Sequence, residues 1–262
     1  MANVQVRILG PVSMVFNGRQ VPLAGQRQLR VLTALALVPG RAVPTSQLIG
    51  HLWGDRPPRT APGQLQTSVW MIRRALASVG APQEIVQSTA SGYQLDADYC
   101  EIDSNTFRSS VANAKRLLRN NLLEDALERL REALALWRGP ALATISSSDL
   151  QSRAARLEEE RVAALQQRIS LEISLGQYEE AIGELTDLIA LHPLREELYA
   201  HLMLALYLSG RQGDALAVFR RARNTLTDEL GIDPGPRLTM LERAILRQDA
   251  EMLTASPAMS RY

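Results

Sequence analysis

The sequence predicts a mainly α-helical fold with small β-sheets, in which a domain of helices and short strands precedes an all-α domain. Segments that alternate between apolar and polar residues occur near the N-terminus, at residues 4–9, 13–16, 20–23, 85–86 and 93–95. Elsewhere, apolar residues recur at helical spacing. In the second half, two helical segments repeat at an offset of 34 residues.

Three helices are expected between the first and last strands, at residues 26–38, 46–53 and 60–78. Before them, Asn17-Gly18 is a strong hairpin signal, and after them residues 89–92 form the turn of a second hairpin. Pro57-Pro58 separates the second helix from the third. The order β-β-β-α-α-α-β-β places a helix-turn-helix before a two-stranded wing, which predicts a winged helix domain.

The third helix combines an apolar stripe with a polar outer face. Its stripe is formed by Leu65, Val69, Ile72 and Leu76. A stripe alone indicates only a buried face, but the element order and nearby arginines make this helix the candidate for the DNA major groove. Amide, hydroxyl and guanidinium groups can contact base edges. The candidates on the outer face are Thr67 and Arg74 first, then Gln64, Trp70 and Met71.

Residues beside this face complete the predicted interface. Arg59 and Thr60 precede the helix, where backbone N–H groups and the helix dipole favour a phosphate. Arg73 lies at the helix flank and is expected to meet phosphate, while Thr89 and Ser91 at the wing tip are expected to touch the minor groove or backbone. Trp70 either stacks on a sugar or a thymine methyl group or packs in a protein interface. For every single residue the alternative is a solvated surface position.

Charge is unevenly distributed along the chain. Residues 1–98 hold nine arginines and four acidic residues, whereas residues 99–262 hold 20 basic and 24 acidic residues. A basic N-terminal part suits a nucleic-acid partner, although chance asymmetry is the alternative.

Helices dominate after residue 98, with no further strand signal. They are expected at 105–119, 122–137, 150–175, 178–191, 195–209, 212–230 and 236–249. In the repeat, Gly176 aligns with Gly210, Ala181 with Ala215, and Leu185 with Phe219. This period is typical of tetratricopeptide repeats, and an irregular helical bundle is the alternative. We expect a DNA-binding domain at 1–98, a helical domain at 99–251 and a flexible tail at 252–262.

Catalytic and metal-binding patterns are absent from the sequence. There is no GxxxxGK[ST] phosphate loop, the three histidines are isolated, and Cys100 is the single cysteine. We therefore expect no enzyme, no cofactor and no metal. No apolar run reaches the roughly 18–20 residues of a membrane helix, and no signal peptide precedes the first strand. A cytoplasmic, nucleoid-associated protein without membrane contact is expected.

Several short motifs are shared with one protein family. In the first half they are Leu9-Gly10-Pro11, Gln26-Arg27-Gln28-Leu29-Arg30, Leu52-Trp53-Gly54-Asp55, Pro57-Pro58, Ile72-Arg73-Arg74-Ala75-Leu76 and Ser91-Gly92-Tyr93. In the second half they are Leu136-Trp137-Arg138-Gly139-Pro140, His192-Pro193-Leu194-Arg195-Glu196, Asp214-Ala215-Leu216 and the run from Asp228 to Pro236. With this combination the sequence resembles the Streptomyces antibiotic regulatory proteins over nearly its whole length. It departs from them at Gln26 and Gln28, where relatives often have one lysine.

The resemblance implies an OmpR-type winged helix followed by a bacterial transcriptional activator domain, in a stand-alone member of the family. It also implies binding to direct repeats near the promoter −35 region, as a homodimer or as side-by-side protomers. Recruitment of RNA polymerase with its sigma factor would then switch on an antibiotic biosynthetic gene cluster. Within the loop at residues 54–59, Asp55 and Arg56 are the implied polymerase contacts.

Two other functions remain open at this point. A tetratricopeptide-type scaffold could sense a ligand or peptide through its concave face, with DNA binding secondary. A repressor could use the same winged helix, because groove binding alone does not decide the sign of regulation.

Overall fold

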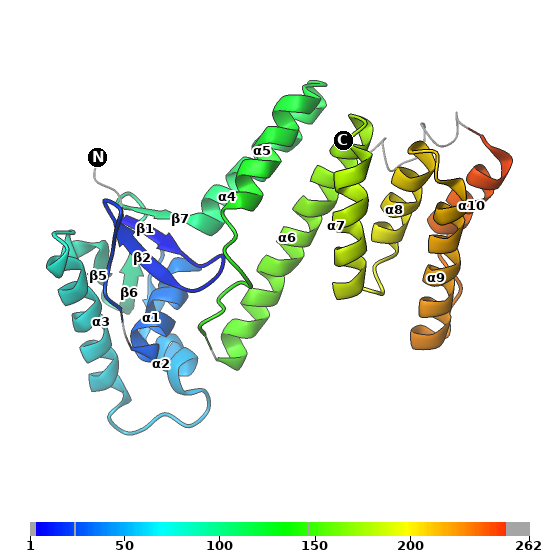
Figure 1. Cartoon of the computed structure of the whole chain (residues 1–262). Coiled ribbons are helices and arrows are strands. Elements are labelled where there is room, and N and C mark those ends of the chain that lie inside the picture. The colour runs from blue at the N-terminus through cyan, green and yellow to red at the C-terminus, as the bar shows by residue number, and fades with distance from the viewer. Residues whose placement is uncertain (1–3, 24, 146, 250–262) are drawn as a thin grey trace. The chain divides into compact units, whose positions relative to one another are not determined.

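The computed structural model describes residues 4–23, 25–145 and 147–249 (Figure 1). Contacts divide the chain into two compact units. The N-terminal unit comprises residues 1–112 and 131–162, and the C-terminal unit comprises residues 113–130 and 163–262. The N-terminal unit extends beyond residue 98 to residue 112, and it also includes the segment at residues 131–162.

A four-stranded sheet opens the N-terminal unit. Its strands are β1 (Val4–Arg7), β2 (Ser13–Phe16), β3 (Arg19–Gln20) and β7 (Cys100–Ile102), in the order β3-β2-β1-β7. Strand β7 runs parallel to β1, with Val4 opposite Cys100 and Val6 opposite Ile102. The expectation that strands end before residue 98 is therefore wrong. Three residues carry too little alternation to predict a strand, and β7 forms because β1 offers it an edge.

Three helices and a second sheet form the winged helix, and its core is built from their apolar faces. The helices are α1 (Gln26–Ala36), α2 (Thr45–Trp53) and α3 (Ala61–Ser78). The sheet contains β4 (Val43–Pro44), β6 (Gly92–Leu95) and β5 (Val86–Ser88) in that order, preceded by a 3₁₀ turn at Gln83–Ile85. Strand β4, which the sequence did not predict, pairs Val43 with Tyr93. Leu32, Leu35, Leu48 and Leu65 are fully buried in the core.

Seven helices follow in the described part of the chain. They are α4 (Asp103–Arg119), α5 (Leu123–Ala135), α6 (Ser148–Ser174), α7 (Tyr178–Leu191), α8 (Glu196–Leu208), α9 (Gln212–Leu230) and α10 (Pro236–Arg247). In the C-terminal unit, α8 packs between α7 and α9, and its residues 198–206 are all buried (Figure 1). These elements confirm the predicted fold class.

The 34-residue repeat has the same geometry in both copies. Gly176 and Gly210 have φ angles of +79° and +82°, which is the left-handed conformation that commonly ends a helix. The following amides donate to equivalent carbonyls, Gln177 to Glu172 and Arg211 to Leu206, each at 2.8 Å. In both copies the next helix has a fully buried alanine as its fourth residue, Ala181 in α7 and Ala215 in α9.

One buried carboxylate connects the first strand to the start of α4. The Asp103 side chain accepts hydrogen bonds from the backbone N–H groups of Ile8 at 2.8 Å and Leu9 at 3.0 Å. It also pairs with Arg138 at 2.9 Å. Gly10, at φ +137°, lies so close to Arg138 that an added Cβ atom would be 3.1 Å from it. The motifs at residues 9–11 and 136–140 therefore pack directly together.

Candidate nucleic-acid interface

Helix α2, an exposed loop and α3 form the helix-turn-helix. Gly54 ends α2 with a φ of +63°, and its N–H group donates to the Gly50 carbonyl at 2.7 Å. Residues 54–60 are exposed, including Asp55, Arg56 and Arg59. Pro62, in the first turn of α3, has no N–H group to satisfy there. The loop thus leads into α3, and no side chain caps the N-terminus of this helix.

Helix α3 divides into the two faces that its sequence predicts. Leu65, Val69, Ile72 and Leu76 are 0–1% exposed. On the other side, Thr67 and Arg74 are exposed, and Trp70 and Met71 are 54% and 42% exposed. Gln64 is half-buried at the margin. The structure thus brings the outer-face candidates together on one surface, while their contacts with DNA stay a prediction.

Trp70 holds Arg74 on the outer face. The guanidinium carbon of Arg74 lies 5.3 Å from the centroid of the Trp70 ring. A cation–π contact of this kind contributes about 0.5–1 kcal/mol at an exposed site. Both earlier interpretations of Trp70 remain open, and this contact adds a third, in which the indole orients the arginine.

The hydroxyl candidates Thr67, on α3, and Thr60, just before it, already have hydrogen-bond partners. Thr67 donates to the Gly63 carbonyl at 2.9 Å, and its oxygen keeps acceptor capacity. The Thr60 hydroxyl accepts from the Gln64 amide at 2.8 Å. Neither hydroxyl caps the helix, so the N–H groups of the first turn keep the phosphate-binding character expected of them.

Arg73 does more than the sequence predicts. Its Nε and Nη2 groups donate to the Val86 carbonyl at 2.9 and 2.7 Å, and Nη2 also donates to the Ser88 hydroxyl at 3.0 Å. The side chain is half-buried and ties α3 to the first strand of the wing. Periodicity alone could not reveal this, because it depends on how the hairpin folds back against the helix.

The wing is anchored at its turn. The backbone N–H of Thr89 donates to the Gly92 carbonyl at 2.9 Å, and the Thr89 hydroxyl accepts from the Gly92 N–H at 3.1 Å. A Cβ atom on Gly92 would lie 2.1 Å from the Val43 carbonyl oxygen, so the position requires glycine. Ser91 is exposed, and its carbonyl accepts from the Thr45 N–H at 3.0 Å. Thr89 therefore shapes the turn, and Ser91 is the more accessible of the two wing candidates.

Helix α1 contributes a residue that the sequence did not connect to this surface. The side-chain amide of Gln28 donates to the Met71 sulfur at 3.0 Å, while its oxygen accepts from the Gly25 N–H at 3.3 Å. The only sequence signal near this position was the expected departure from the family at Gln26 and Gln28, which did not distinguish between the two residues.

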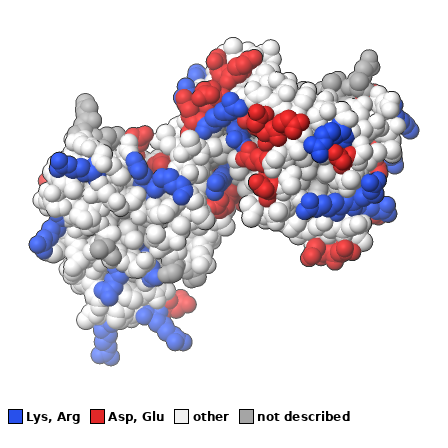
Figure 2. All heavy atoms as spheres, viewed as in Figure 1, with Lys and Arg blue, Asp and Glu red and all other residues white. Residues whose placement is uncertain are grey.

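Arginine is the main charged residue around this surface. Figure 2 shows Lys and Arg predominating over the winged helix, whereas acidic and basic side chains mix over the helical domain. Within the described residues, no group of three His, Cys, Asp or Glu side chains is placed to hold a metal ion. No helix in the described part of the chain is both long and apolar enough to span a membrane.

The arrangement of a winged helix followed by a domain of repeated helices defines a class, the winged-helix transcription regulators. Two family models match it: "Transcriptional regulatory protein, C terminal" at residues 18–95 and "Bacterial transcriptional activator domain" at residues 102–246. The chain belongs to the Streptomyces antibiotic regulatory protein family. The expected boundary between residues 98 and 99 falls between the two matches and stays a proposal.

Individual relatives support the same assignment. The chain is 36% identical over 253 residues to the regulatory protein DnrI of Streptomyces peucetius, covering 94% of this chain and 93% of DnrI. It is 36% identical over 252 residues to the regulatory protein AfsR of Streptomyces griseus, covering 96% of this chain and 25% of AfsR. The solved structure of Mycobacterium tuberculosis EmbR, in complex with a low affinity phosphopeptide, matches with a TM-score of 0.92 and 33% identity. That match covers 99% of this chain and 69% of the EmbR chain.

Proposed function

We propose that this protein is a sequence-specific DNA-binding activator that switches on an antibiotic biosynthetic gene cluster. The observation that carries the proposal is the exposed face of α3, where Thr67, Trp70 and Arg74 project from a winged helix. The names of its relatives as regulatory proteins support a regulator rather than an enzyme. In this proposal the protein acts in the cytoplasm, on the nucleoid, and needs no cofactor.

In this proposal α3 enters the major groove. Arg74 can donate two hydrogen bonds to the O6 and N7 atoms of a guanine, and the Thr67 oxygen can accept from a base amino group. Arg59 and the uncapped N-terminus of α3 contact phosphate, while Ser91 brings the wing to the adjacent backbone. Gln64 and Met71 flank the readout residues. We assign Arg73 mainly to positioning the wing, because its guanidinium is engaged by Val86 and Ser88.

Pairing of protomers supplies the selectivity that one winged helix lacks. A single module buries little protein surface on DNA, roughly 600–1,000 Å². When one protomer is bound, a second protomer that contacts it reaches the adjacent direct repeat at a high effective concentration. The preference of each protomer for the correct DNA sequence then multiplies that of the other. We therefore propose binding as a dimer or as side-by-side protomers near the −35 region, in contact with RNA polymerase and its sigma factor.

Run-off transcription with purified RNA polymerase holoenzyme tests this proposal. The template carries a promoter from a neighbouring biosynthetic cluster with its direct repeats, and the control template has one repeat scrambled. We expect the protein to raise transcript from the intact template only. A fall in transcript would instead identify a repressor. An absence of any effect, together with no template binding, would favour the scaffold function.

A further inference from the structure

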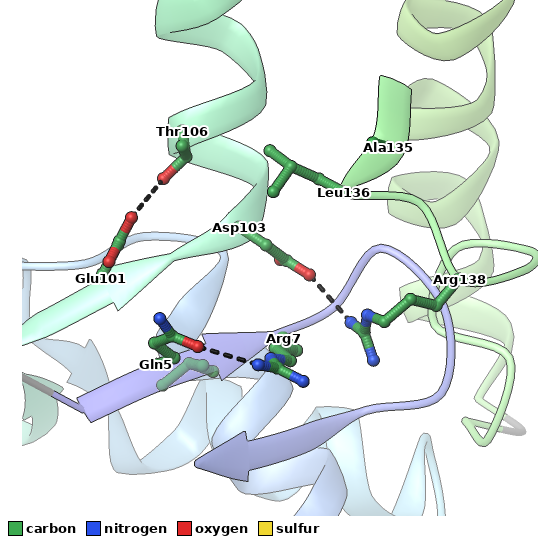
Figure 3. A pocket seen from close by; sticks show the side chains of 9 residues that line it. Gln5, Arg7, Glu101, Asp103, Thr106, Ala135, Leu136 and Arg138 are labelled. Atoms are coloured by element: carbon green, nitrogen blue, oxygen red, sulfur yellow. Dashed lines mark hydrogen bonds and ion pairs between the residues drawn. The ribbon is translucent and has the colours of Figure 1, made fainter. Parts of the chain in front are cut away.

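A cavity of about 350 Å³ opens beside β1 and β7, on the face of the strand pair that turns away from the core (Figure 3). Val4 and Val6 of β1 point into the core, so the alternate residues Gln5 and Arg7 point toward the cavity. Glu101 of β7 lies next to Gln5 in the parallel register. The walls come from the first turn of α4 and from residues 135–138.

The carboxylates that line this cavity have partners. Asp103 pairs with Arg138 and also accepts from two backbone N–H groups. Glu101 accepts a hydrogen bond from the Thr106 hydroxyl at 3.2 Å. Arg138 in turn also donates to the Pro11 carbonyl at 3.3 Å. These contacts fix the rim of the cavity.

Arg7 differs from Arg138, the other arginine of the lining, because Arg138 pairs with Asp103. The Arg7 side chain is half-buried, and its Nη2 group donates to the neutral amide oxygen of Gln5 at 2.9 Å. Among the described residues, no carboxylate lies within ion-pair distance of it. A guanidinium without a charged partner can bind an anion through charge-assisted hydrogen bonds.

We propose that this cavity binds a small organic carboxylate, with its carboxylate group on Arg7 and its apolar body against Leu136 and Ala135. The volume is near the lower end of the range for ligand pockets, about 300–1,000 Å³. A carboxylate matches the planar fork of a guanidinium. The Gln5 amide nitrogen is a further donor, because Arg7 engages only its oxygen.

The charges of the lining favour a monoanion over a phosphate dianion. The lining holds two arginines and two carboxylates, so its formal charge is zero. Arg7 is the arginine without an ion pair, while Glu101 adds a negative charge that only the Thr106 hydroxyl contacts. A second negative charge on the ligand would therefore meet repulsion without gaining a partner. The apolar wall at Leu136 further favours a carboxylate attached to a ring or short chain.

Thermal unfolding of the full chain with 2-naphthoate as the probe tests this inference. A ligand that binds only the folded state stabilises it by RT ln(1 + [L]/Kd) and therefore raises the Tm. We expect 2-naphthoate to raise the Tm, whereas 2-naphthamide, of the same shape without the charge, and inorganic phosphate leave it unchanged. Isothermal titration calorimetry then gives the Kd for the variants.

Two variants remove binding for different reasons. Arg7→Gln deletes the cation and Ala135→Phe fills the cavity without altering its charge, and each is expected to weaken naphthoate binding at least tenfold. Arg19→Gln, an exposed arginine of β3 in the same sheet, is the matched control and should bind as the parent does. Circular dichroism confirms that each variant is folded.

Three results would overturn the inference. They are no stabilisation by 2-naphthoate, equal stabilisation by the neutral amide or by phosphate, and unchanged binding in both cavity variants. The readout involves no DNA, so a negative result leaves the proposed function untouched.

Discussion

Arg74 is the single residue on which we expect base readout to depend most. Trp70 restrains its guanidinium from the same helix face, which lowers the entropy lost when it meets a base. Arg74→Ala should therefore cost about 1–3 kcal/mol of specific binding, measured by fluorescence anisotropy on the promoter repeats at fixed salt. Arg19→Ala is the control for loss of one exposed arginine. Equal losses on promoter and scrambled DNA would remove Arg74 from the readout set.

The contact between Trp70 and Arg74 predicts how substitutions of Trp70 affect specific DNA binding. Trp70→Phe retains an aromatic face for the guanidinium and should keep most of the specificity, whereas Trp70→Ala should lose part of it. The difference between the two is expected to be on the order of 0.5–1 kcal/mol. If both variants lose specific binding equally, the indole contacts DNA or protein directly and does not act through Arg74.

Substitutions of Arg73 can distinguish a structural role in the wing from an electrostatic contact with DNA. Arg73→Lys keeps the charge but loses the fork that spans Val86 and Ser88, so we expect a lower Tm with little change in the salt dependence of DNA binding. Arg73→Ala should lower the Tm at least as much. A phosphate contact would instead show as a flatter salt slope for Arg73→Ala, with the Tm unchanged in both variants.

Among elements, those with long apolar periodicity were predictable from sequence and those formed by pairing were not. Helix α3 follows from the spacing of Leu65, Val69 and Ile72, and the structure buries all three. Strands β4 and β7 contain two and three residues and exist because β6 and β1 offer them partners. The outer face of α3 was likewise predictable from periodicity, whereas the hydrogen bonds from Arg73 to the wing were not. Those hydrogen bonds depend on how α3 and β5 pack together.

Helix α8 carries a buried titratable group, His201, which is 5% exposed. The pKa of His201 is lowered from 6.5 to about 4, mainly by burial and also by the nearby Arg237, while Glu197 partly opposes the shift. Since the folded pKa is depressed, the unfolded chain binds more protons between pH 4 and 6.5, and stability falls as the pH falls through this window. Between pH 7 and 5 the expected loss is about 2 kcal/mol.

Urea unfolding at several pH values measures this loss. His201→Leu cannot take up a proton, so its stability should change less between pH 7 and 5 than that of the parent chain. His192→Leu, which removes a histidine from the turn after α7, is the matched control for the loss of one imidazole. Identical pH dependence in the parent and His201→Leu would contradict the assignment.

At the scale of the whole molecule, Asp103 joins the residues after β1 to the start of α4 and to Arg138. Asp103→Ala would leave buried N–H groups of Ile8 and Leu9 without an acceptor. An unsatisfied buried donor costs about 1–3 kcal/mol, so the variant should unfold at clearly lower urea concentration. Asp98→Ala, at an exposed position, is the control. If the two variants unfold at the same urea concentration, Asp103 contributes little to this junction.

Activation should be separable from DNA binding at the loop between α2 and α3. Asp55 and Arg56 are exposed in a segment that Pro57-Pro58 stiffens, and this lowers the entropy cost of contact with a partner. Substituting alanine at both Asp55 and Arg56 should leave promoter affinity within about twofold, since neither lies on the outer face of α3, but reduce run-off transcription severalfold. The control is Arg74→Ala, which should reduce affinity and transcription together. Full activation by the loop variant at saturating occupancy would place the polymerase contact elsewhere.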